Sequence, residues 1–522
     1  RDTGTLWIIA GVGAVVVLLG WAAVTVNTVL TARTGERLLF GLRLRSFVHL
    51  LRLSMDYFER TMSGRIMTRM TTDIDNLSSF LQTGLAQTVV SVGTLVGVVT
   101  MLLITDATLA LAALAVVPVI VVLTLIFRRI SSRLYTQARE QISQVNATFQ
   151  ESIAGLRTAQ MHRMEDRVNN TFEREAEEYR RLRVNSQTAV SIYFPGLTAL
   201  SEIAQALVLG LGAWQVARGQ LSPGVLVAFV LYMGLMFGPI QQLSQIFDSY
   251  QQAAVGFRRI RELLATTPSV PDDGTTPGAR AAAGGHLMLD DVSFAYTDTP
   301  ILENVHLTIE PGTTIAVVGP TGAGKSTIVK LLSRLYDPTA GQVCAAGTDI
   351  RDFPTRDWRL AIGHVPQEAH LFSGTVADNI GYGMTGASQS MIEDAARRVG
   401  ALTAIAAIPG GFNHPVGERG RGLSSGQRQL IALARAELIE PVIMLLDEAT
   451  STLDPATETV ILNASARVTR NRTSVIVAHR LATASRADRI IVVDGGRIIE
   501  DGSHDELLGA HGTYATMWHL VG

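Results

Sequence analysis

The sequence predicts a multi-domain protein in which an all-α transmembrane domain precedes an α/β domain of the P-loop type. Five long apolar segments lie in the first 250 residues, and short apolar strands alternate with helical stretches from residue 286 onward. The second region also contains a glycine-rich loop at residues 319–326. We expect the membrane domain at residues 1–265, a linker rich in Thr, Pro, Ala and Gly at 266–285, and the α/β domain at 286–522.

The composition supports a membrane protein, but unevenly along the chain. Hydrophobic residues make up 47% of the 522 residues and charged residues only 17%, and the long apolar runs are confined to the first half. The net charge of −2 gives no indication of nucleic-acid binding, and we expect no nucleic-acid partner. The single cysteine, Cys344, excludes an intramolecular disulfide and argues against a cysteine-based metal site.

Each apolar segment is long enough to cross a lipid bilayer, which takes about 20 helical residues. Five such segments within half of a chain are not typical of buried core helices in a water-soluble protein. The expected spans cover residues 6–30, 83–105, 107–127, 192–216 and 225–247.

The arginines predict how these spans are oriented. The first-to-second and third-to-fourth connections are long and rich in arginine, whereas the other two are short and carry little charge (Asp106 and Arg218). Because basic connections remain in the cytoplasm, we expect the long connections, and everything after residue 250, to be cytoplasmic. Both long connections look helical, and at about 1.5 Å per residue they would extend well beyond the membrane.

Five spans are an odd number and would place the N-terminus outside the cell. A sixth span before Arg1 would return the N-terminus to the cytoplasm, and the chain begins without a methionine. We therefore expect the chain to be a piece of a longer polypeptide.

The glycine-rich loop fits the spacing G-x-x-x-x-G-K-[ST], with a β-branched strand pattern at residues 314–318 before it and a helical pattern through Leu332 after it. Glycines allow successive backbone N–H groups to point at phosphate oxygens, and the helix N-terminus adds partial positive charge. The nucleotide-binding residues expected here are Gly319, Pro320, Thr321, Gly322, Ala323, Gly324, Lys325, Ser326 and Thr327.

Two side chains of this loop have distinct expected roles. Lys325 would bring its charge to the outer phosphates, and the hydroxyl of Ser326 would ligate Mg²⁺. Of the 44 basic residues, only Lys325 and Lys330 are lysines. A compact ammonium fits inside a ring of backbone amides where a planar guanidinium would not.

A second apolar strand pattern, residues 442–446, ends in two carboxylates. Asp447 at the strand end would hold Mg²⁺ through its water shell, and Glu448 would polarise the attacking water. Gln367 lies where an amide would reach the metal, Tyr296 where a ring would stack on adenine, and His479 where an imidazole would contact the γ-phosphate. Taken singly, these last three residues are equally compatible with ordinary structural roles.

A serine-glycine turn opens another expected helix, and such a turn offers a further anion site or simply an N-cap. Its residues are Ser424, Ser425, Gly426 and Gln427, preceded by Leu423.

These motifs, in this order, resemble the ABC transporter family, specifically an exporter-type half with a membrane domain followed by an ATPase domain. The resemblance covers nearly the whole chain, and among relatives it is to the C-terminal half of fused actinobacterial multidrug exporters. It identifies residues 319–327 as Walker A, Gln367 as the Q-loop, residues 423–427 as the signature, and Asp447 as Walker B.

The same resemblance assigns further residues. It implies that Tyr296 stacks on adenine, that Glu448 is the catalytic glutamate, that residues 451–454 form the D-loop, and that His479 is the switch histidine. Residues 417–420 resemble the segment just ahead of the signature that meets the membrane domain. Residues 57–73 and 151–157 resemble the two cytoplasmic coupling regions.

Two residues depart from the family pattern: Ser425 stands where the family usually has glycine, and Leu430 where it often has arginine. The family has six spans per half, so the first is expected to be missing here.

The resemblance implies ATP and Mg²⁺ as cofactors and export of drugs, lipids or other amphipathic compounds across a bacterial plasma membrane. ATP would lie between Walker A of one half and the signature, Ser424–Gln427, of a second half, which is a copy, a different chain or a fused neighbour. Alternatives left open are a siderophore importer, an ATP-gated channel or regulator, and a soluble ABC ATPase.

Glu202 lies inside the fourth expected span, seven residues after Pro195. Because a carboxylate at membrane depth is costly, it would either face a cavity and contact cationic substrates or form a helix–helix hydrogen bond. The sequence does not choose between these roles.

Overall fold

The computed structural model describes residues 3–447, 455–478 and 480–521, and it divides into two compact units. The first unit comprises residues 1–46 and 68–263, and the second comprises residues 47–67 and 264–522. The short segment 47–67 therefore belongs with the C-terminal unit, although the sequence places it between two membrane spans. Each unit is described separately below.

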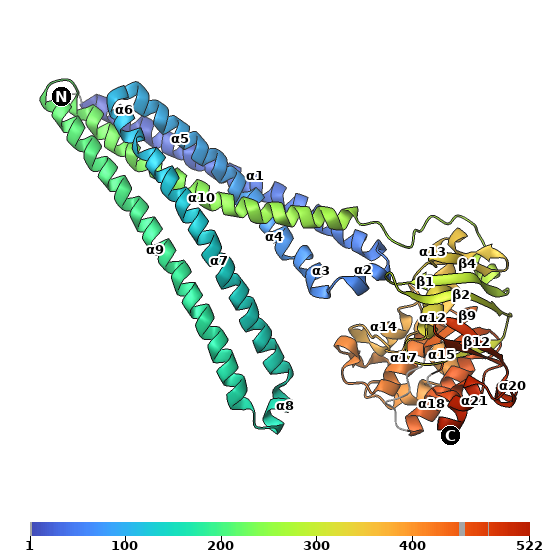
Figure 1. The fold of residues 1–522 in the computed structure, drawn as a ribbon. Coiled ribbons are helices and arrows are strands. Elements are labelled where there is room, and N and C mark those ends of the chain that lie inside the picture. The colour runs from blue at the N-terminus through green and yellow to red at the C-terminus, as the bar shows by residue number, and fades with distance from the viewer. Residues whose placement is uncertain (1–2, 448–454, 479, 522) are drawn as a thin grey trace. The chain divides into compact units, whose positions relative to one another are not determined.

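The first unit is entirely helical in its described residues (Figure 1). Five helical stretches are long and apolar enough to cross a membrane, which confirms the expected membrane domain. The helices of this half of the chain are α1 (Thr3–Arg52), α2 (Met55–Arg60), α3 (Ser63–Met70), α4 (Thr72–Ser79), the π-helix η1 (Phe80–Gly84), α5 (Leu85–Thr105), α6 (Ala107–Leu114), α7 (Val116–Ala154), α8 (Leu156–Met161), α9 (Glu165–Ala217) and α10 (Pro223–Ala265).

Local sequence explains where these helices begin and end. Asp106 separates α5 from α6, and its carboxylate accepts hydrogen bonds from the backbone N–H groups of Thr108 and Leu109, both at 2.9 Å. An aspartate N-cap of this kind satisfies backbone donors that a helix start leaves free. Helices α7 and α9 run side by side through the long third-to-fourth connection, with α8 at its end (Figure 1).

Packing within the first unit is concentrated in one apolar cluster. Leu102, Leu109, Ala204 and Phe229 are buried there, from helices α5, α6, α9 and α10. By contrast, none of the most apolar window of α1 is buried within the chain. Apolar side chains exposed in this way require lipid or another protein surface to cover them.

The second unit contains a four-stranded sheet in the order β2–β1–β4–β5, a six-stranded sheet in the order β12–β11–β3–β10–β9–β6, and the pair β7–β8. The strands are β1 (Leu287–Ala295), β2 (Pro300–Ile309), β3 (Thr314–Val318), β4 (Ala340–Ala345), β5 (Thr348–Asp349), β6 (Ile362–Val365), β7 (Gly374–Thr375), β8 (Pro415–Val416), β9 (Ile443–Asp447), β10 (Thr473–Val477), β11 (Arg489–Asp494) and β12 (Arg497–Gly502).

The helices of this unit that follow residue 278 pack against the six-stranded sheet or against one another. They are α11 (Ala279–Ala283), α12 (Lys325–Leu332), α13 (Thr355–Leu360), α14 (Val376–Gly381), α15 (Gln389–Val399), α16 (Leu402–Ala406), α17 (Ser425–Leu438), α18 (Pro455–Thr469), α19 (Leu481–Ala484), α20 (His504–Gly509) and α21 (Thr513–Val521), with short 3-10 turns η2 (Ile350–Asp352), η3 (Gly411–Asn413) and η4 (Glu418–Gly420).

Strand β3 separates two apolar clusters. Ile315 and Val317 pack with Ile328 of α12, whereas Ala316 and Val318 pack with Leu430 of α17. Because successive strand residues point to opposite faces of a sheet, α12 and α17 lie on opposite faces. The α/β class expected from the sequence is confirmed.

The segment expected to be a linker is attached to the second unit at defined points. Arg334, only 1% exposed, donates to the carbonyl oxygens of Pro271 at 2.9 Å and Phe353 at 2.8 Å. Asp272 accepts from the backbone N–H of Thr355 at 2.8 Å, and this hydrogen bond lowers the pKa of its carboxyl. A Cβ on Gly274 would lie 2.3 Å from the carbonyl oxygen of Phe353, so only glycine fits this close approach.

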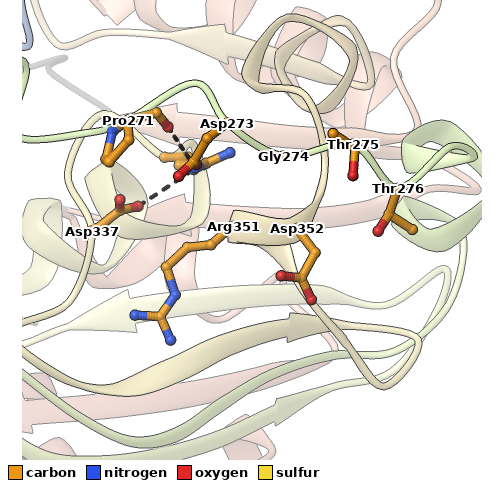
Figure 2. Close-up of a pocket in the computed structure, with 9 residues that line it drawn as sticks. Pro271, Asp273, Gly274, Thr275, Thr276, Asp337, Arg351 and Asp352 are labelled. Carbon is orange, nitrogen blue, oxygen red and sulfur yellow. Dashed lines mark hydrogen bonds and ion pairs between the residues drawn. The ribbon is translucent and has the colours of Figure 1, made fainter.

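A polar pocket lies where this segment crosses the domain (Figure 2). Its lining combines the linker residues 271 and 273–276 with Arg334, Asp337, Arg351 and Asp352, and includes none of residues 319–327. The pocket therefore lies where the linker is attached to the domain and does not include the glycine-rich loop.

Candidate functional site

The glycine-rich loop, residues 319–326, is called the phosphate loop below because of its predicted role. It connects the central strand β3 to helix α12. Three of its glycines have backbone φ values in the left-handed region: 145° at Gly319, 85° at Gly322 and 104° at Gly324. A Cβ at Gly319 would also lie 2.0 Å from the carbonyl oxygen of Val493. Glycine is required at these positions because a side chain would strain the backbone, clash, or both. The strand, loop and helix therefore form as the sequence predicts.

Lys325, the first residue of α12, is 7% exposed and lies against its own loop. Its Nζ donates to the carbonyl oxygens of Gly319 at 2.8 Å and Pro320 at 2.7 Å. Burial lowers the pKa of Lys325, while the negative charge of Asp447 acts in the opposite direction. The ammonium is thus held at the loop, within electrostatic reach of the carboxylate that ends β9.

Strand order brings the remaining candidates to the same edge of the sheet. In the parallel register, Val477 of β10 pairs with Val317 of β3 and also with Asp447 of β9, and Val365 of β6 pairs with Leu446. The carboxyl ends of β3, β10, β9 and β6 therefore lie next to one another, and ligands of open parallel sheets bind at such an edge. Gln367 follows β6 by two residues and is exposed.

Asp447 has the surroundings of a metal ligand. Its Oδ1 is buried and has no hydrogen-bond partner among the described residues. A buried carboxylate oxygen without a partner is costly, so the site fits a divalent cation or its bound water. The described residues contain no group of three or more His, Cys, Asp or Glu side chains that could hold a metal ion by itself, but Mg²⁺ is commonly held by one carboxylate together with substrate phosphates.

Glu448, His479 and the segment 451–454 lie outside the described residues. Their roles as catalytic glutamate, switch histidine and D-loop stay predictions. The described strands β9 and β10 end at Asp447 and Val477, at the same sheet edge as the phosphate loop.

Tyr296 lies directly after β1 and is half-buried. Its hydroxyl is 3.3 Å from Oγ1 of Thr327 in α12. Its ring meets those of Phe294 and Tyr336 edge-on, with centroids 4.8 and 5.2 Å apart. The structure thus places the expected adenine-stacking residue beside the helix that carries the phosphate loop.

The serine-glycine turn forms the start of α17. Ser424 is its N-cap: its Oγ accepts from the N–H of Gln427 at 3.2 Å, and its own N–H donates to Gln427 Oε1 at 2.9 Å. Gly426 is buried, and a Cβ there would lie 2.1 Å from Cγ2 of Thr457. Ser425 is half-buried. Leu430, where the family often has arginine, is buried in the apolar cluster on this face of the sheet.

The structure does not join this turn to the phosphate loop of the same chain. No hydrogen bond or ion pair links residues 424–427 with residues 319–327 among those described, and α17 and α12 pack on opposite faces of the sheet. Within the described residues, the two motifs of this chain therefore do not meet around one site.

Comparison with known proteins now identifies the family. Residues 1–240 match the family model described as "ABC transporter transmembrane region", and residues 302–451 match the one described as "ABC transporter". A lipid A-core flippase of Syntrophus aciditrophicus, described as ATP-dependent, is 33% identical over 495 residues, which cover 95% of this chain and 82% of the relative. The chain belongs to the ABC transporter family.

Other relatives agree on the exporter type. A multidrug efflux ATP-binding/permease protein of Mycobacterium tuberculosis is 43% identical over 518 residues, which cover 98% of this chain. The chain spans only 43% of the length of that relative. The solved structure of a bacterial Atm1-family ABC exporter with ATP bound matches with a TM-score of 0.82 and 28% identity, covering 100% of this chain and 92% of the other. The exporter-type resemblance and fold class are confirmed, as is a multi-pass membrane protein with an ATP-binding domain.

Some contacts of this ABC transporter chain were not anticipated from its sequence. Glu437 of α17, 4% exposed in its side chain, is held by Arg398 at 2.9 Å and Arg472 at 2.9 Å. In the second unit, α2 also contacts the neighbourhood of Tyr296 through Glu59 and Arg60. The sequence marked Lys330 as one of two lysines and residues 57–73 as resembling a coupling region, but single charged residues give no signal of which partners they contact.

Proposed function

We propose that this chain is one half of an ATP-driven exporter that moves drugs, lipids or other small amphipathic compounds out of a bacterial cell. The observation that carries the proposal is the common sheet edge of the phosphate loop, Asp447 and Gln367, in a chain with five membrane-length apolar helices. The printed names of the relatives, multidrug efflux protein and lipid flippase, support export rather than siderophore uptake or channel activity.

ATP is bound first by the loop and its neighbours. The backbone N–H groups of residues 319–327 face the phosphates, Lys325 moves its ammonium from the loop carbonyls to the outer phosphates, and Tyr296 stacks on adenine. The buried start of α12 supports this assignment because a low dielectric strengthens each of these charged contacts.

A magnesium ion would be held by the Ser326 hydroxyl and by Asp447 and Gln367, in part through water. When bound, Mg²⁺ neutralises phosphate charge. The unpartnered Oδ1 of Asp447 supports its part in this set.

Hydrolysis converts ATP and water to ADP and inorganic phosphate. In the proposed reaction Glu448 orients the attacking water and accepts its proton, and His479 contacts the γ-phosphate. Gln367 connects the metal to the surface of the ATPase domain. This enzyme class is an ATP hydrolase coupled to transport, or ABC-type translocase.

The partner is a second ABC half, as a copy, a different chain or a fused neighbour. Its signature would cover the ATP held by this chain, and Ser424, Ser425, Gly426 and Gln427 would cover the ATP of the partner. The opposite-face packing of α12 and α17 supports an arrangement in trans. Closure of the two ATPase domains on ATP would then switch the membrane halves, with the ATPase domain in the cytoplasm and the helices in the plasma membrane.

The decisive experiment is Glu448→Gln in the full-length protein. We expect steady-state ATPase activity and ATP-driven uptake of a fluorescent drug into inverted vesicles to be lost, while the Kd for ATP stays within about twofold, because binding and water activation use different groups. Unchanged turnover would contradict the role of Glu448. Uptake into right-side-out vesicles instead would contradict export.

A further inference from the structure

Glu202 is a charged residue inside the membrane domain whose role the contacts described so far do not explain. It lies on α9 within the expected span 192–216, and at 1.5 Å per residue its position is at least about 15 Å from either end of that span. Its side chain is exposed, and no hydrogen bond or ion pair joins it to another described residue. A carboxylate at this depth is costly unless a polar or positive group faces it.

Two faces of α9 near Glu202 have surroundings that its side chains explain. Residues three or four positions apart lie on one face of a helix, and one such row is buried within the chain: Leu197, Ser201, Ala204 and Val208. Ala204 and Val208 belong to the apolar cluster that α9 shares with α5, α6 and α10. A second row is exposed and apolar or aromatic, as expected for contact with lipid: Ile203, Leu207 and Trp214.

Glu202 lies on a third face, called the Glu202 face below. Its members, again three or four positions apart, are Phe194, Thr198, Glu202 and Gln205. Phe194 is 36% exposed, and Thr198 and Glu202 are exposed, so the chain itself does not cover this face. Because lipid tails offer a carboxylate neither charge nor hydrogen bonds, ionisable residues in spans face a cavity or a protein interior. The Glu202 face is therefore directed away from lipid in the assembled transporter.

The five expected spans contain no positive side chain that could pair with Glu202. They include no Lys, Arg or His, and Glu202 is their only Asp or Glu. A second copy of this chain would therefore bring a second carboxylate to this depth, and no cation. Since neighbouring carboxylates disfavour each other's charge, the positive group that compensates Glu202 in such an assembly has to belong to a bound molecule.

The arginines next to the spans are engaged with aromatic rings. The guanidinium carbon of Arg218, which follows α9, lies 3.7 Å from the centroid of the Trp214 ring. That of Arg128 on α7 lies 4.1 Å from the centroid of the Phe247 ring. Both contacts are cation–π interactions, and neither arginine forms an ion pair with Glu202 among the described residues.

We propose that the Glu202 face recognises the positive group of a cationic amphipathic compound, which makes Glu202 a specificity-determining residue of the exporter. The inference rests on the proposed export function and narrows its substrate class to cations. The carboxylate attracts the positive group, Thr198 and Gln205 offer polar contacts beside it, and the exposed ring of Phe194 packs against the apolar body. Phe194 precedes Glu202 by eight residues, about 12 Å along the helix, which suits a molecule with separate charged and apolar parts.

The test compares tetraphenylphosphonium with tetraphenylborate, two probes of the same shape with permanent charges of opposite sign. Saturable binding of each radiolabelled probe is measured by equilibrium dialysis, without nucleotide, on the full-length protein in phosphatidylglycerol nanodiscs, after subtraction of empty discs. The variants are Glu202→Gln and Glu202→Asp. Glu173→Gln is the matched control, because Glu173 is an exposed glutamate of the same helix outside the expected span.

We expect Glu202→Gln to raise the Kd for tetraphenylphosphonium at least about tenfold, because a charge contact shielded from water is lost. The Kd for tetraphenylborate should stay the same or fall, since the repelling carboxylate is gone. Glu202→Asp, which keeps the charge, should bind tetraphenylphosphonium within about threefold of the unmodified protein, and Glu173→Gln should leave both values unchanged.

Three results would overturn the proposal. One is an equal Kd for tetraphenylphosphonium in the unmodified protein and in Glu202→Gln, and another is no saturable binding of this probe to the unmodified protein. The third is an equal rise of both Kd values, which would show that Glu202 pairs with a different partner half or supports the packing of α9.

The cation could belong to an exported drug or to the amine of a membrane lipid. Adding phosphatidylethanolamine to the nanodiscs distinguishes these sources. If a lipid amine occupies the Glu202 face, the Kd for tetraphenylphosphonium should rise in the unmodified protein and not in Glu202→Gln. If it rises in neither, the site is selective for the soluble cation.

ATP-driven uptake into inverted vesicles separates this inference from the proposed function. If a neutral fluorescent drug is taken up with ATP while Glu202→Gln binds tetraphenylphosphonium normally, export holds and the role of Glu202 is wrong. If tetraphenylphosphonium binding depends on Glu202 but ATP drives uptake of neither compound, the cation site holds and the export function is wrong.

Discussion

His364 shows how a single residue is affected by the candidate site. It lies on β6, opposite Leu445 of β9, and burial lowers its pKa, with the charge of Asp447 acting in the opposite direction. The side chain is therefore held neutral in the folded protein at a pH where it would begin to gain a proton in the unfolded chain. Such a difference makes stability depend on pH.

We expect His364 to contribute a loss of stability as the pH falls. Its folded pKa lies below the unfolded value of about 6.5, so the unfolded state binds more protons once the pH drops below about 6.5. As the pH falls from there to the pKa of His364 in the folded protein, the free energy of unfolding decreases by up to about 1.4 kcal/mol per pH unit. Above pH 7 this decrease should be absent.

The measurement is pulse proteolysis of the second unit in urea, at pH 7.5 and pH 5.5, on the full-length protein and on His364→Gln. The free energy of unfolding should fall less between these two values in the variant. A difference between the two proteins that is the same at both pH values would show that His364 is not held neutral by the fold.

At the scale of elements, the N-termini of α12 and α17 have different roles in the proposed mechanism. Both begin at a turn with free backbone N–H groups, which attract anions. At the start of α12 the N-cap is Gly324, and Lys325 is the first residue of the helix. At the start of α17, Ser424 and Gln427 form a capping box. Because they pack on opposite faces of one sheet, these two helix starts serve two different nucleotides in the proposed mechanism.

Ser424→Asp tests whether the start of α17 faces the ATP of the partner half. Aspartate is as good an N-cap as serine, so α17 should form normally, but its charge would face the phosphates of the ATP held by the partner half. We expect ATPase activity to fall at least about tenfold, since like charges about 4 Å apart repel by several kcal/mol at an effective dielectric of about 20. Stability should change little.

Ser503→Asp is the matched control. Ser503 caps α20 with the same type of capping box, made with Glu506, and is not part of the candidate site. Turnover by Ser503→Asp should stay near that of the unmodified protein. If Ser424→Asp is also fully active, then Ser424 does not face phosphate in the working transporter.

At the scale of the whole molecule, the apolar helices require a bilayer. The first helix has no buried residues in its most apolar window, and α5, α7, α9 and α10 contribute further windows that are at most 22% buried. Covering this surface with lipid is favourable by about 25 cal/mol for each Å² removed from water. The charged residues are concentrated in the ends of these helices and in the second unit.

We therefore expect an alkaline carbonate wash to leave the full-length protein in the membrane pellet, and a mild detergent to release it. Immunoblotting of the pellet and supernatant checks this result, with a peripheral membrane protein as the control that the wash should release. Release by carbonate alone would contradict the membrane assignment and favour a soluble ABC ATPase.

Local patterns were enough to predict much of this chain. The five spans, the strand–loop–helix at residues 314–332 and the strands that end at Asp447 and Val477 are all specified by residues close together in sequence. Their hydrophobic periods and glycine positions reflect short-range sterics and burial. The site positions at Glu448 and His479 stay sequence predictions, because they lie outside the described residues.

Glu202 shows the limit of such patterns. Its side chain is exposed on α9, between the buried Ser201 and Ala204, and makes no hydrogen bond or ion pair within the described residues. Among the described residues, Glu202 therefore does not form the helix–helix hydrogen bond that was one of its two expected roles. Which surface faces Glu202 depends on lipid, substrate or a second half, none of which can be inferred from the neighbouring sequence.

The sequence by itself determined which segments are long and apolar enough to cross a membrane and which loop has the spacing of a phosphate-binding loop, because both follow from side chains within about 20 residues of each other. Only the tertiary structure decided that β10 lies between the strands carrying the loop and Asp447, and that α2 joins the ATPase domain through Glu59, Lys330 and Tyr336. These contacts connect residues up to 277 positions apart. Contacts between residues so far apart in sequence depend on how whole helices and strands pack, which cannot be inferred from the residues next to each of them.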